Sequence, residues 1–358
     1  MKLVLAVMLA LGVSVASAVM PQQSVKIEGE FGVYTLPSVF YTQATSKSLD
    51  EDLNLFIDSL CKKEYVAPKD ATLIFDASLQ KVIVTQEKPG CAVDKQALKG
   101  LILDAIELGG VVKIPKTTVE PTIKAQSLMS ATYLRAEFTT YYLAERIERA
   151  GNIALATKTI NGTVVLPNQV FSFNKVVGER TEERGYKIAK VIKGGTFADG
   201  IGGGVCQVST TLYNAVLLAG LKVTEVHRHT LAVDYVKRSF DAMVSFGFAD
   251  LKFVNDTSHP ILIVGWVKNG LVGFSVYGCE KTVDIKLESV TTKRIEPKTN
   301  VIFNPSLDSG VTNVVVSPKP GYESQGYLII DDGTTTVKKL IRRDTYKCVD
   351  GIIETGGE

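Results

Sequence analysis

One cysteine of this chain, Cys206, lies where a thiol can act as a nucleophile. Three glycines at 202–204 come just before it, and apolar residues at helical spacing follow it over 208–219. Gly220 then fits the position after a helix C-terminus. The pattern predicts that a glycine-rich loop delivers Cys206 to the N-terminus of a helix.

Such a position favours nucleophilic chemistry. Free N–H groups and the positive end of the helix dipole stabilise a thiolate over a thiol. The same N–H groups, with those of the glycine loop, can hold a developing oxyanion. We therefore assign Gly202, Gly203, Gly204, Gln207 and Ser209 to the oxyanion and substrate environment. Two plainer interpretations remain open: a buried cysteine in a tight turn, and a helix-capping role for Ser209.

Two of the three histidines are candidate partners for this cysteine. His227 and His229 are two residues apart, so on a strand they point to the same face, as does Glu225. We predict that His229 is the general base and that His227 lines the same cavity. The alternative is a strand with a solvated polar face. His259, between Ser258 and Pro260, is predicted to be a solvent-facing turn residue.

Three further charged residues are candidates for the site. Asp241 is predicted to orient the imidazole, with Asp250 as an alternative and a turn or cap role for Asp241 equally open. Arg180 is predicted to bind a substrate carboxylate, together with Arg184. The competing interpretation of that charged run is a solvated loop.

The chain as a whole has 358 residues and a net charge of +2, which gives no nucleic-acid signal. Residues 1–18 read as a signal peptide that ends in Ala-Ser-Ala, so the mature protein is expected to be secreted or wall-associated. An uncleaved N-terminal membrane anchor is the alternative. No other stretch is long and apolar enough to span a bilayer.

The five cysteines are an odd number, so at least one thiol stays free or pairs with another chain. Pairing within segments, Cys61 with Cys91 and Cys279 with Cys348, leaves Cys206 as the free thiol. A reducing setting that leaves all five free is the other possibility.

The predicted architecture is α+β and multidomain, with a mixed α/β core flanked by two smaller modules. After the signal peptide we expect an α+β module over 19–122, a core over 123–270 and an all-β module over 271–358. In the first module the patterns predict helices at 48–60 and 94–108 and strands at 71–76, 81–85 and 111–114. In the core they predict helices at 139–150 and from 207, and strands at 164–166, 170–173, 222–236, 242–248, 251–254 and 261–267.

The core resembles the VanW family, named after an accessory protein of vancomycin-resistance clusters. The resemblance rests on sequence blocks in a fixed order: 149–153, 160–167, 171–174, 177–181, 201–213, 227–230, 241–242 and 250–255. The block around Cys206 is the strongest. Asn168 and Thr230 depart from the family's usual residues, and neither lies in the predicted chemistry.

The resemblance implies work at the bacterial cell wall. The first module resembles a peptidoglycan-binding domain that often precedes this core, and the tail is similar to short glycine-containing β modules. Some members are similar to L,D-transpeptidases that use a cysteine. Peptidoglycan stem peptides are thus the expected partner, with no cofactor and no metal.

Three function classes remain open. The first is a cysteine acyltransferase, either transpeptidase or carboxypeptidase. The second is a zinc-dependent peptidoglycan hydrolase with Cys206, His227 and His229 as ligands. The third is a module that binds wall peptide or glycopeptide without chemistry.

Overall fold

The computed structural model describes residues 24–42, 47–193 and 196–356. It divides into two compact units, which we describe separately. The first holds residues up to Asp70 together with Glu87–Thr122, and the second holds Ala71–Gln86 together with Ile123–Glu358. The predicted signal peptide lies outside the described residues.

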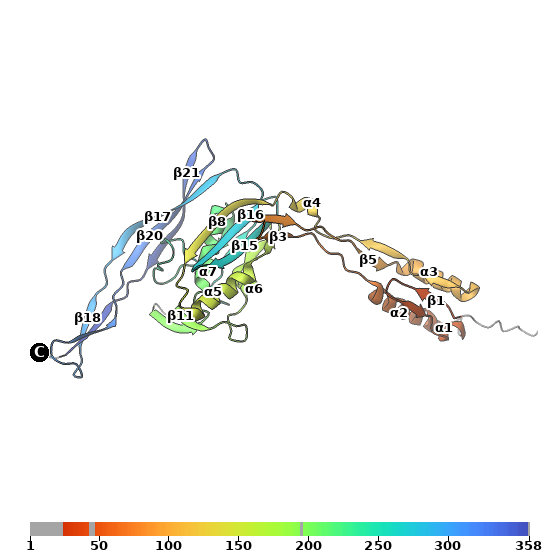
Figure 1. The fold of residues 1–358 in the computed structure, drawn as a ribbon, viewed down its shortest axis with the longest axis horizontal. Helices are drawn as coiled ribbons and strands as arrows, with labels where there is room; N and C mark the ends of the chain where they lie inside the picture. Colours follow the sequence, from red (N-terminus) through yellow and green to blue (C-terminus); the bar gives the residue numbers. More distant parts are fainter. Residues whose placement is uncertain (1–23, 43–46, 194–195, 357–358) are drawn as a thin grey trace, which may run out of the picture. The chain divides into compact units, whose positions relative to one another are not determined.

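The first unit is a small α+β module in which two helices lie side by side (Figure 1). Its helices are α1 Val39–Thr42, α2 Lys47–Glu64 and α3 Lys95–Leu108, and its strands are β1 Lys26–Glu28, β2 Val33–Thr35, β5 Gly90–Val93, β6 Val111–Lys113 and β7 Lys116–Val119. The sheet order is β2-β1-β6, and β5 pairs with β7. Asp94 caps α3 by accepting a hydrogen bond from the Ala97 N–H.

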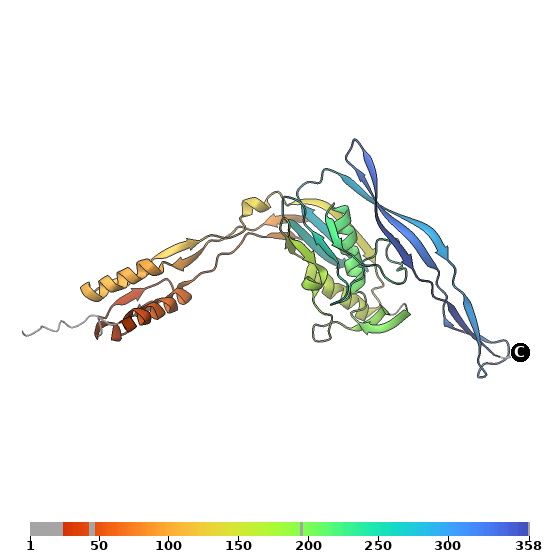
Figure 2. The ribbon, with the colours of Figure 1, turned by 180° about the vertical axis from the view of Figure 1, so that it is seen from behind.

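The core of the second unit is a four-stranded sheet with order β8-β16-β15-β9, against which helices α5 and α7 pack (Figure 2). These strands are β8 Tyr133–Tyr141, β9 Thr163–Val165, β15 Ile261–Lys268 and β16 Leu271–Gly278, and the helices are α4 Ala125–Leu128, α5 Ile147–Ile160, α6 Phe173–Val177 and α7 Val205–Leu218. The side chains between them form one buried apolar cluster.

Smaller sheets surround this core. They are the hairpin of β3 Leu73–Asp76 and β4 Lys81–Val84, the hairpin of β11 Ile188–Lys193 and β12 Thr196–Ile201, and the sheet of β10 Val170–Ser172, β14 Lys252–Val254 and β13 Lys222–Glu225. The β3–β4 hairpin contributes Leu73 and Val82 to a cluster with Leu262 and Val264 of β15.

The tail of the second unit is all-β, as predicted. Its strands are β17 Asp284–Ile295, β18 Thr299–Phe303, β19 Thr312–Val316, β20 Gly321–Asp331, β21 Thr336–Tyr346 and β22 Gly351–Thr355. They form two sheets, with orders β17-β20-β21 and β18-β22-β19. Leu287, Leu328 and Ile341 of the first of these sheets pack against the apolar cluster of the core.

Several sequence predictions differ from the structure. Residues 139–141, predicted to start a helix, end strand β8, where Thr139, Thr140 and Tyr141 pair with β16. Their β-branched and aromatic side chains suit a strand, and the helix of this region is α5, which begins at Ile147. The predicted strand over 222–236 is only β13, and the one over 242–248 is reduced to isolated bridges.

The predicted module boundaries also differ in detail. The hairpin over 71–86, which the sequence places in the first module, belongs to the second unit. A boundary between residues 270 and 271 would separate β15 from β16, although these strands pair along their whole length. The predicted pairs Cys61–Cys91 and Cys279–Cys348 do not form, because all five cysteines are free thiols; Cys206 is free, as predicted.

Among the described residues, no helix is both long and apolar enough to cross a membrane.

Candidate active site

Cys206 is the second residue of helix α7, so the prediction that it lies at a helix N-terminus is confirmed. Gly204 is the N-cap with a φ of 109°, and Gly202 has a φ of 82°. Glycine is the residue that adopts such angles without steric cost. Cys206 itself remains partly exposed among buried neighbours.

The three glycines let other chain segments approach closely. A Cβ at Gly203 would lie 2.7 Å from the Lys190 carbonyl oxygen, one at Gly202 would lie 3.1 Å from Arg180 Cβ, and one at Gly204 would lie 3.1 Å from Arg149 Cγ. The N–H groups of Val205 and Gln207 already donate to the carbonyls of Gly202 and Gly204. The loop therefore has a packing role, and these two N–H groups are not free for an oxyanion.

Cys206, His229 and Asp241 form one interacting group. Cys206 and His229 interact electrostatically, each shifting the pKa of the other, and the Cys206 thiol donates to the Val244 carbonyl at 3.4 Å. His229 Nδ1 lies 2.8 Å from Asp241 Oδ2, and the His229 backbone N–H donates to the same oxygen at 2.6 Å. His229 and Asp241 are 5% and 1% exposed. The order cysteine, imidazole, carboxylate is that of a nucleophile, its base and the group that orients the base.

The charges in this group support one another. Burial raises the pKa of the Cys206 thiol, but the hydrogen bond and charge of His229, followed by the Val244 backbone and Arg180, outweigh it and lower that pKa overall. Burial lowers the pKa of His229, but Asp241 and Cys206 raise it to about 9. The pKa of Asp241 is lowered, because its interactions with His229 and Arg342 outweigh its burial. The site therefore favours a thiolate beside an imidazolium.

Polar side chains of α7 hold the segment that carries Asp241. Ser209 Oγ donates to the Ala242 carbonyl at 2.6 Å, and Thr210 Oγ1 accepts from the Ala242 N–H at 2.9 Å. Asn214 Nδ2 donates to the Phe240 carbonyl at 2.8 Å. Ser209, predicted as a substrate or capping residue, is thus turned inward and ties the aspartate segment to the cysteine helix.

Two arginines accompany Cys206. Arg180 Nη1 donates to Asn174 Oδ1 at 2.7 Å, while its Nη2 is buried and has no hydrogen-bond partner among the described residues. Arg149 Nη2 donates to Gln207 Oε1 at 2.9 Å. Burial lowers the pKa of both guanidiniums, and the negative charge of a Cys206 thiolate opposes that shift. Gln207, predicted as a substrate residue, is buried and occupied by Arg149, Thr140 and Tyr141.

The remaining predicted residues lie elsewhere. His227 Nε2 pairs with Glu225 Oε1 at 3.0 Å, and Glu225 also pairs with Lys252 at 2.8 Å. The structure thus joins His227 to this surface network and not to Cys206. Asp250 accepts hydrogen bonds from Ser172 Oγ and the Asn174 N–H, so it is a structural residue of the α6 start.

The last two residues considered in the sequence analysis, Arg184 and His259, make local contacts. Arg184 is exposed and donates to the Glu179 carbonyl. His259 is a partly exposed turn residue whose Nδ1 lies 3.0 Å from Ser258 Oγ.

A metal centre would need at least three ligands that converge. Within the described ranges, no such group of His, Cys, Asp and Glu side chains occurs. Because His227 is paired with Glu225, the ligand set of the zinc alternative is not assembled.

Four residues of this environment were missed by sequence reasoning. Arg149 and Tyr235 interact electrostatically with the thiol. Arg342 and Tyr346 reach Asp241 from the tail. Only Arg149 stood in a sequence block that already carried the family resemblance.

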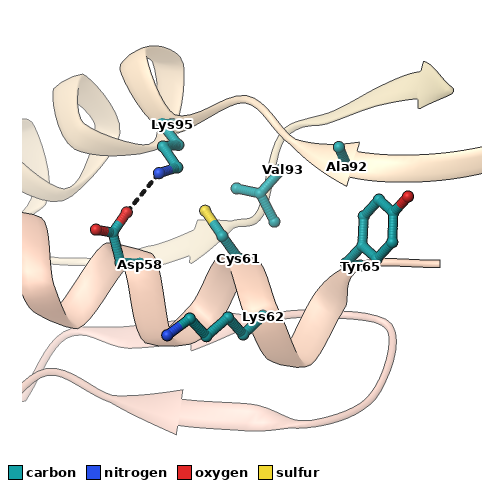
Figure 3. Close-up of a pocket in the computed structure, with 7 residues that line it drawn as sticks. All are labelled: Asp58, Cys61, Lys62, Tyr65, Ala92, Val93 and Lys95. Carbon is teal, nitrogen blue, oxygen red and sulfur yellow. Dashed lines mark hydrogen bonds and ion pairs between the residues drawn. The ribbon is translucent and has the colours of Figure 1, made fainter. Parts of the chain in front are cut away.

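Two pockets lie away from Cys206. One, of about 460 Å³, is in the first unit and is lined by Asp58, Cys61, Lys62, Tyr65, Ala92, Val93 and Lys95 (Figure 3). The other, of about 310 Å³, lies in the second unit between α7 and β17, with Asn214, Leu218, Phe240 and Leu287 among its lining residues. Neither contains the Cys206 group.

The fold and this group define a modular protein with a cysteine–histidine–aspartate site on a helix N-terminus. Comparison with protein families matches residues 148–277 to the VanW-like protein model and residues 286–358 to the G5 domain model. The chain thus carries a VanW-like region over residues 148–277 and a G5 region over residues 286–358.

Two curated proteins are similar to the VanW part. YoaR of Bacillus subtilis (strain 168) is 42% identical over 153 residues, which are 42% of this chain and 50% of YoaR. The vancomycin B-type resistance protein VanW of Enterococcus faecalis (strain ATCC 700802 / V583) is 33% identical over 112 residues, which are 30% of this chain and 40% of that protein. The chain thus spans half or less of the curated relatives it matches.

Two solved G5 structures match about a fifth of the chain. The IgA1 protease G5 domain is 21% identical, with a TM-score of 0.17, and covers 21% of this chain and 90% of its own. HP0197-G5 is 18% identical, with a TM-score of 0.14, and covers 21% of this chain and all of its own. The G5 assignment rests on the family model. Together, the VanW and G5 domains point to a cell-wall-associated protein.

Proposed function

We propose that this protein is an enzyme that cleaves a peptide bond in peptidoglycan stem peptides by acyl transfer through Cys206. The observation that carries the proposal is the buried, hydrogen-bonded His229–Asp241 pair, which interacts electrostatically with the partly exposed Cys206 thiol. A structural cysteine needs no such partner, whereas a cysteine nucleophile does.

The proposed reaction has two steps. The Cys206 thiolate attacks the carbonyl carbon between the third and fourth stem residues, a C–S bond forms, and the C–N bond breaks. His229 donates its proton to the leaving amine. Water or an acceptor amine then attacks the thioester, His229 takes the proton of that nucleophile, and the thiolate leaves. Water gives carboxypeptidation and an amine gives transpeptidation.

The arginines support a substrate that ends in a carboxylate. Arg180 has an unused buried donor, and Arg149 lies on the other side of the glycine loop. A guanidinium is well suited to a carboxylate because it offers paired donors. The terminal carboxylate of a four-residue stem is the group that we expect Arg180 to bind.

Intact mass spectrometry tests the proposal. The full chain is incubated with purified four-residue muropeptides, and we expect an acyl adduct on Cys206 together with release of the fourth residue. Cys206→Ala should lose both, while Cys61→Ala keeps both. Full turnover by Cys206→Ala would contradict the proposal.

The alternative is a wall-binding accessory protein without chemistry, which the G5 domain favours. In that case muropeptides would bind the wild type and Cys206→Ala equally, and neither protein would release a product.

A further inference from the structure

Asp241 is held by two parts of the chain at once. Its Oδ2 faces His229, as described above. Its Oδ1 accepts a hydrogen bond of 2.6 Å from Tyr346 Oη and lies 3.6 Å from Arg342 Nη2. Arg342 Nη1 also donates to the Asp241 backbone carbonyl at 2.5 Å. Tyr346 and Arg342 both belong to β21, in the G5 domain.

The hydroxyl proton of Tyr346 is donated to Asp241. Tyr346 is 1% exposed, and its oxygen accepts a hydrogen bond of 2.8 Å from the Ser239 N–H. Since a phenol has one proton and that oxygen already accepts from Ser239, the proton points to Asp241. A buried hydrogen bond to an ionised carboxylate is a strong one.

The backbone that leads to Asp241 is also held by the tail. Ser239 has a φ of 65°, an unusual conformation for a residue with a side chain. Its Oγ lies 2.8 Å from Ser324 Oγ of β20. Such a conformation persists where the surroundings fix it, and here two strands of the tail supply those surroundings.

Arg342 further links the aspartate to the cysteine helix. Its guanidinium lies over the ring of Tyr213 in α7, 5.9 Å from the ring centroid. It is itself paired with Asp344 Oδ1 at 3.0 Å. One side chain of the tail thus contacts both the helix that starts at Cys206 and the carboxylate that faces His229.

We propose that Tyr346 and Arg342 of the G5 domain are positioning residues of the Cys206–His229–Asp241 group, so that the tail completes the site. By holding Oδ1, they aim Oδ2 at His229 Nδ1 and keep the ring turned so that its other nitrogen serves the thiol. The effect on turnover rests on the proposed function, but the effect on the thiol does not.

The test uses the full chain and two readouts. The first is the rate at which iodoacetamide modifies Cys206, followed on its peptide by mass spectrometry from about pH 5 to about pH 10. The second is muropeptide turnover. The variants are Tyr346→Phe and Arg342→Gln, with Asp241→Asn as the reference for full loss. Tyr327→Phe is the matched control, because its hydroxyl bonds Gln325 within the same module.

We expect Tyr346→Phe to move the alkylation midpoint of Cys206 toward that of an ordinary cysteine, in the same direction as Asp241→Asn. Turnover should fall by about tenfold to a hundredfold, which is the worth of one hydrogen bond to a charged group. Arg342→Gln should act in the same direction, and Tyr327→Phe should match the wild type. Circular dichroism checks that Tyr346→Phe folds. If it does not, Arg342→Lys replaces it, because lysine keeps the positive charge but lacks the paired donors of the guanidinium.

The outcomes separate the two proposals. Unchanged alkylation midpoints in the tail variants, or in Asp241→Asn itself, would overturn the positioning role even if the wild type turns over muropeptides. Shifted midpoints in a protein without any turnover would support the positioning role and remove the proposed function.

Discussion

Cys206 and Cys61 both lie on helices and are both partly exposed, but their surroundings act on the thiol in opposite directions. Cys206 begins α7, whereas Cys61 lies in the last turn of α2, at the end of the helix that disfavours negative charge. Burial raises the pKa of the Cys61 thiol, and no protonated histidine offsets it.

The nearest cation explains the rest of the difference. Lys95 shares the pocket of Cys61, but its Nζ is paired with Asp58 at 2.5 Å (Figure 3). The charge of His229 acts on Cys206 and lowers the pKa of its thiol, and the His229 ring is itself hydrogen-bonded to Asp241 through Nδ1. At Cys61 the nearby cation is paired with a carboxylate. At Cys206 the carboxylate stabilises the positive charge of the imidazole, and that charge still acts on the thiol.

After Cys206→Ala, the largest effect should come from His229→Ala. Loss of a general base slows turnover by about 10²- to 10⁴-fold, and the remaining thiol should behave like Cys61. His227→Ala is the matched control, because it removes an imidazole that pairs with Glu225. Steady-state rates on muropeptides measure both variants. An equal loss in both would mean that the two histidines act together.

The second effect is on thiol reactivity. At about pH 7 we expect iodoacetamide to modify Cys206 at least about tenfold faster than Cys61, since each unit of pKa changes the thiolate fraction tenfold. Because the pKa of Cys206 is lowered and that of Cys61 is raised, the alkylation rate should begin to increase at a lower pH for Cys206 than for Cys61 as the pH is raised. Peptide-resolved mass spectrometry gives both rates in one sample. Equal rates would show that the environment of Cys206 does not form a thiolate.

A smaller effect should follow from Arg180→Gln. If Arg180 binds the substrate carboxylate, KM rises by about tenfold while the alkylation rate of Cys206 changes much less. Arg184→Gln is the control, since Arg184 is exposed and bonds the Glu179 carbonyl. A fall in kcat with unchanged KM would place Arg180 in the chemical step instead.

The smallest effect is expected for Cys61→Ala. This change leaves turnover unchanged and costs about 1 kcal/mol or less of unfolding free energy, because the thiol borders an open pocket. Urea unfolding and muropeptide turnover measure the two quantities. A clear loss of turnover would show that the first unit takes part in the reaction.

The local part of this site could be predicted from the sequence. Spacing of apolar residues and the glycines at 202–204 indicated the helix N-terminus at Cys206, and the structure has it there. The contact of Asp241 with His229 could not be told apart from one with another carboxylate, because it depends on how residues 226–243 fold back. Strand β8 was missed because its residues carry no clear alternation and are fixed by pairing with β16.

The long-range part could not be predicted. Tyr346 lies 105 residues after Asp241, and nothing in its own neighbourhood marks it as part of a site. The polar residues of α7 gave a misleading signal for the same reason. Ser209 looked like a cap or a substrate contact, although its partner is the Ala242 carbonyl on a distant segment.

The close packing of the glycines has a consequence for how this sequence tolerates change. An added Cβ at Gly203 would press on the backbone of Ala189 and Lys190, so that position is constrained by folding whether or not any reaction occurs. Position 206 has no such constraint, since a smaller residue fits there. If the proposed chemistry were lost in a related protein, packing would still hold the glycines while the cysteine could vary, so the glycine triplet alone does not mark an enzyme.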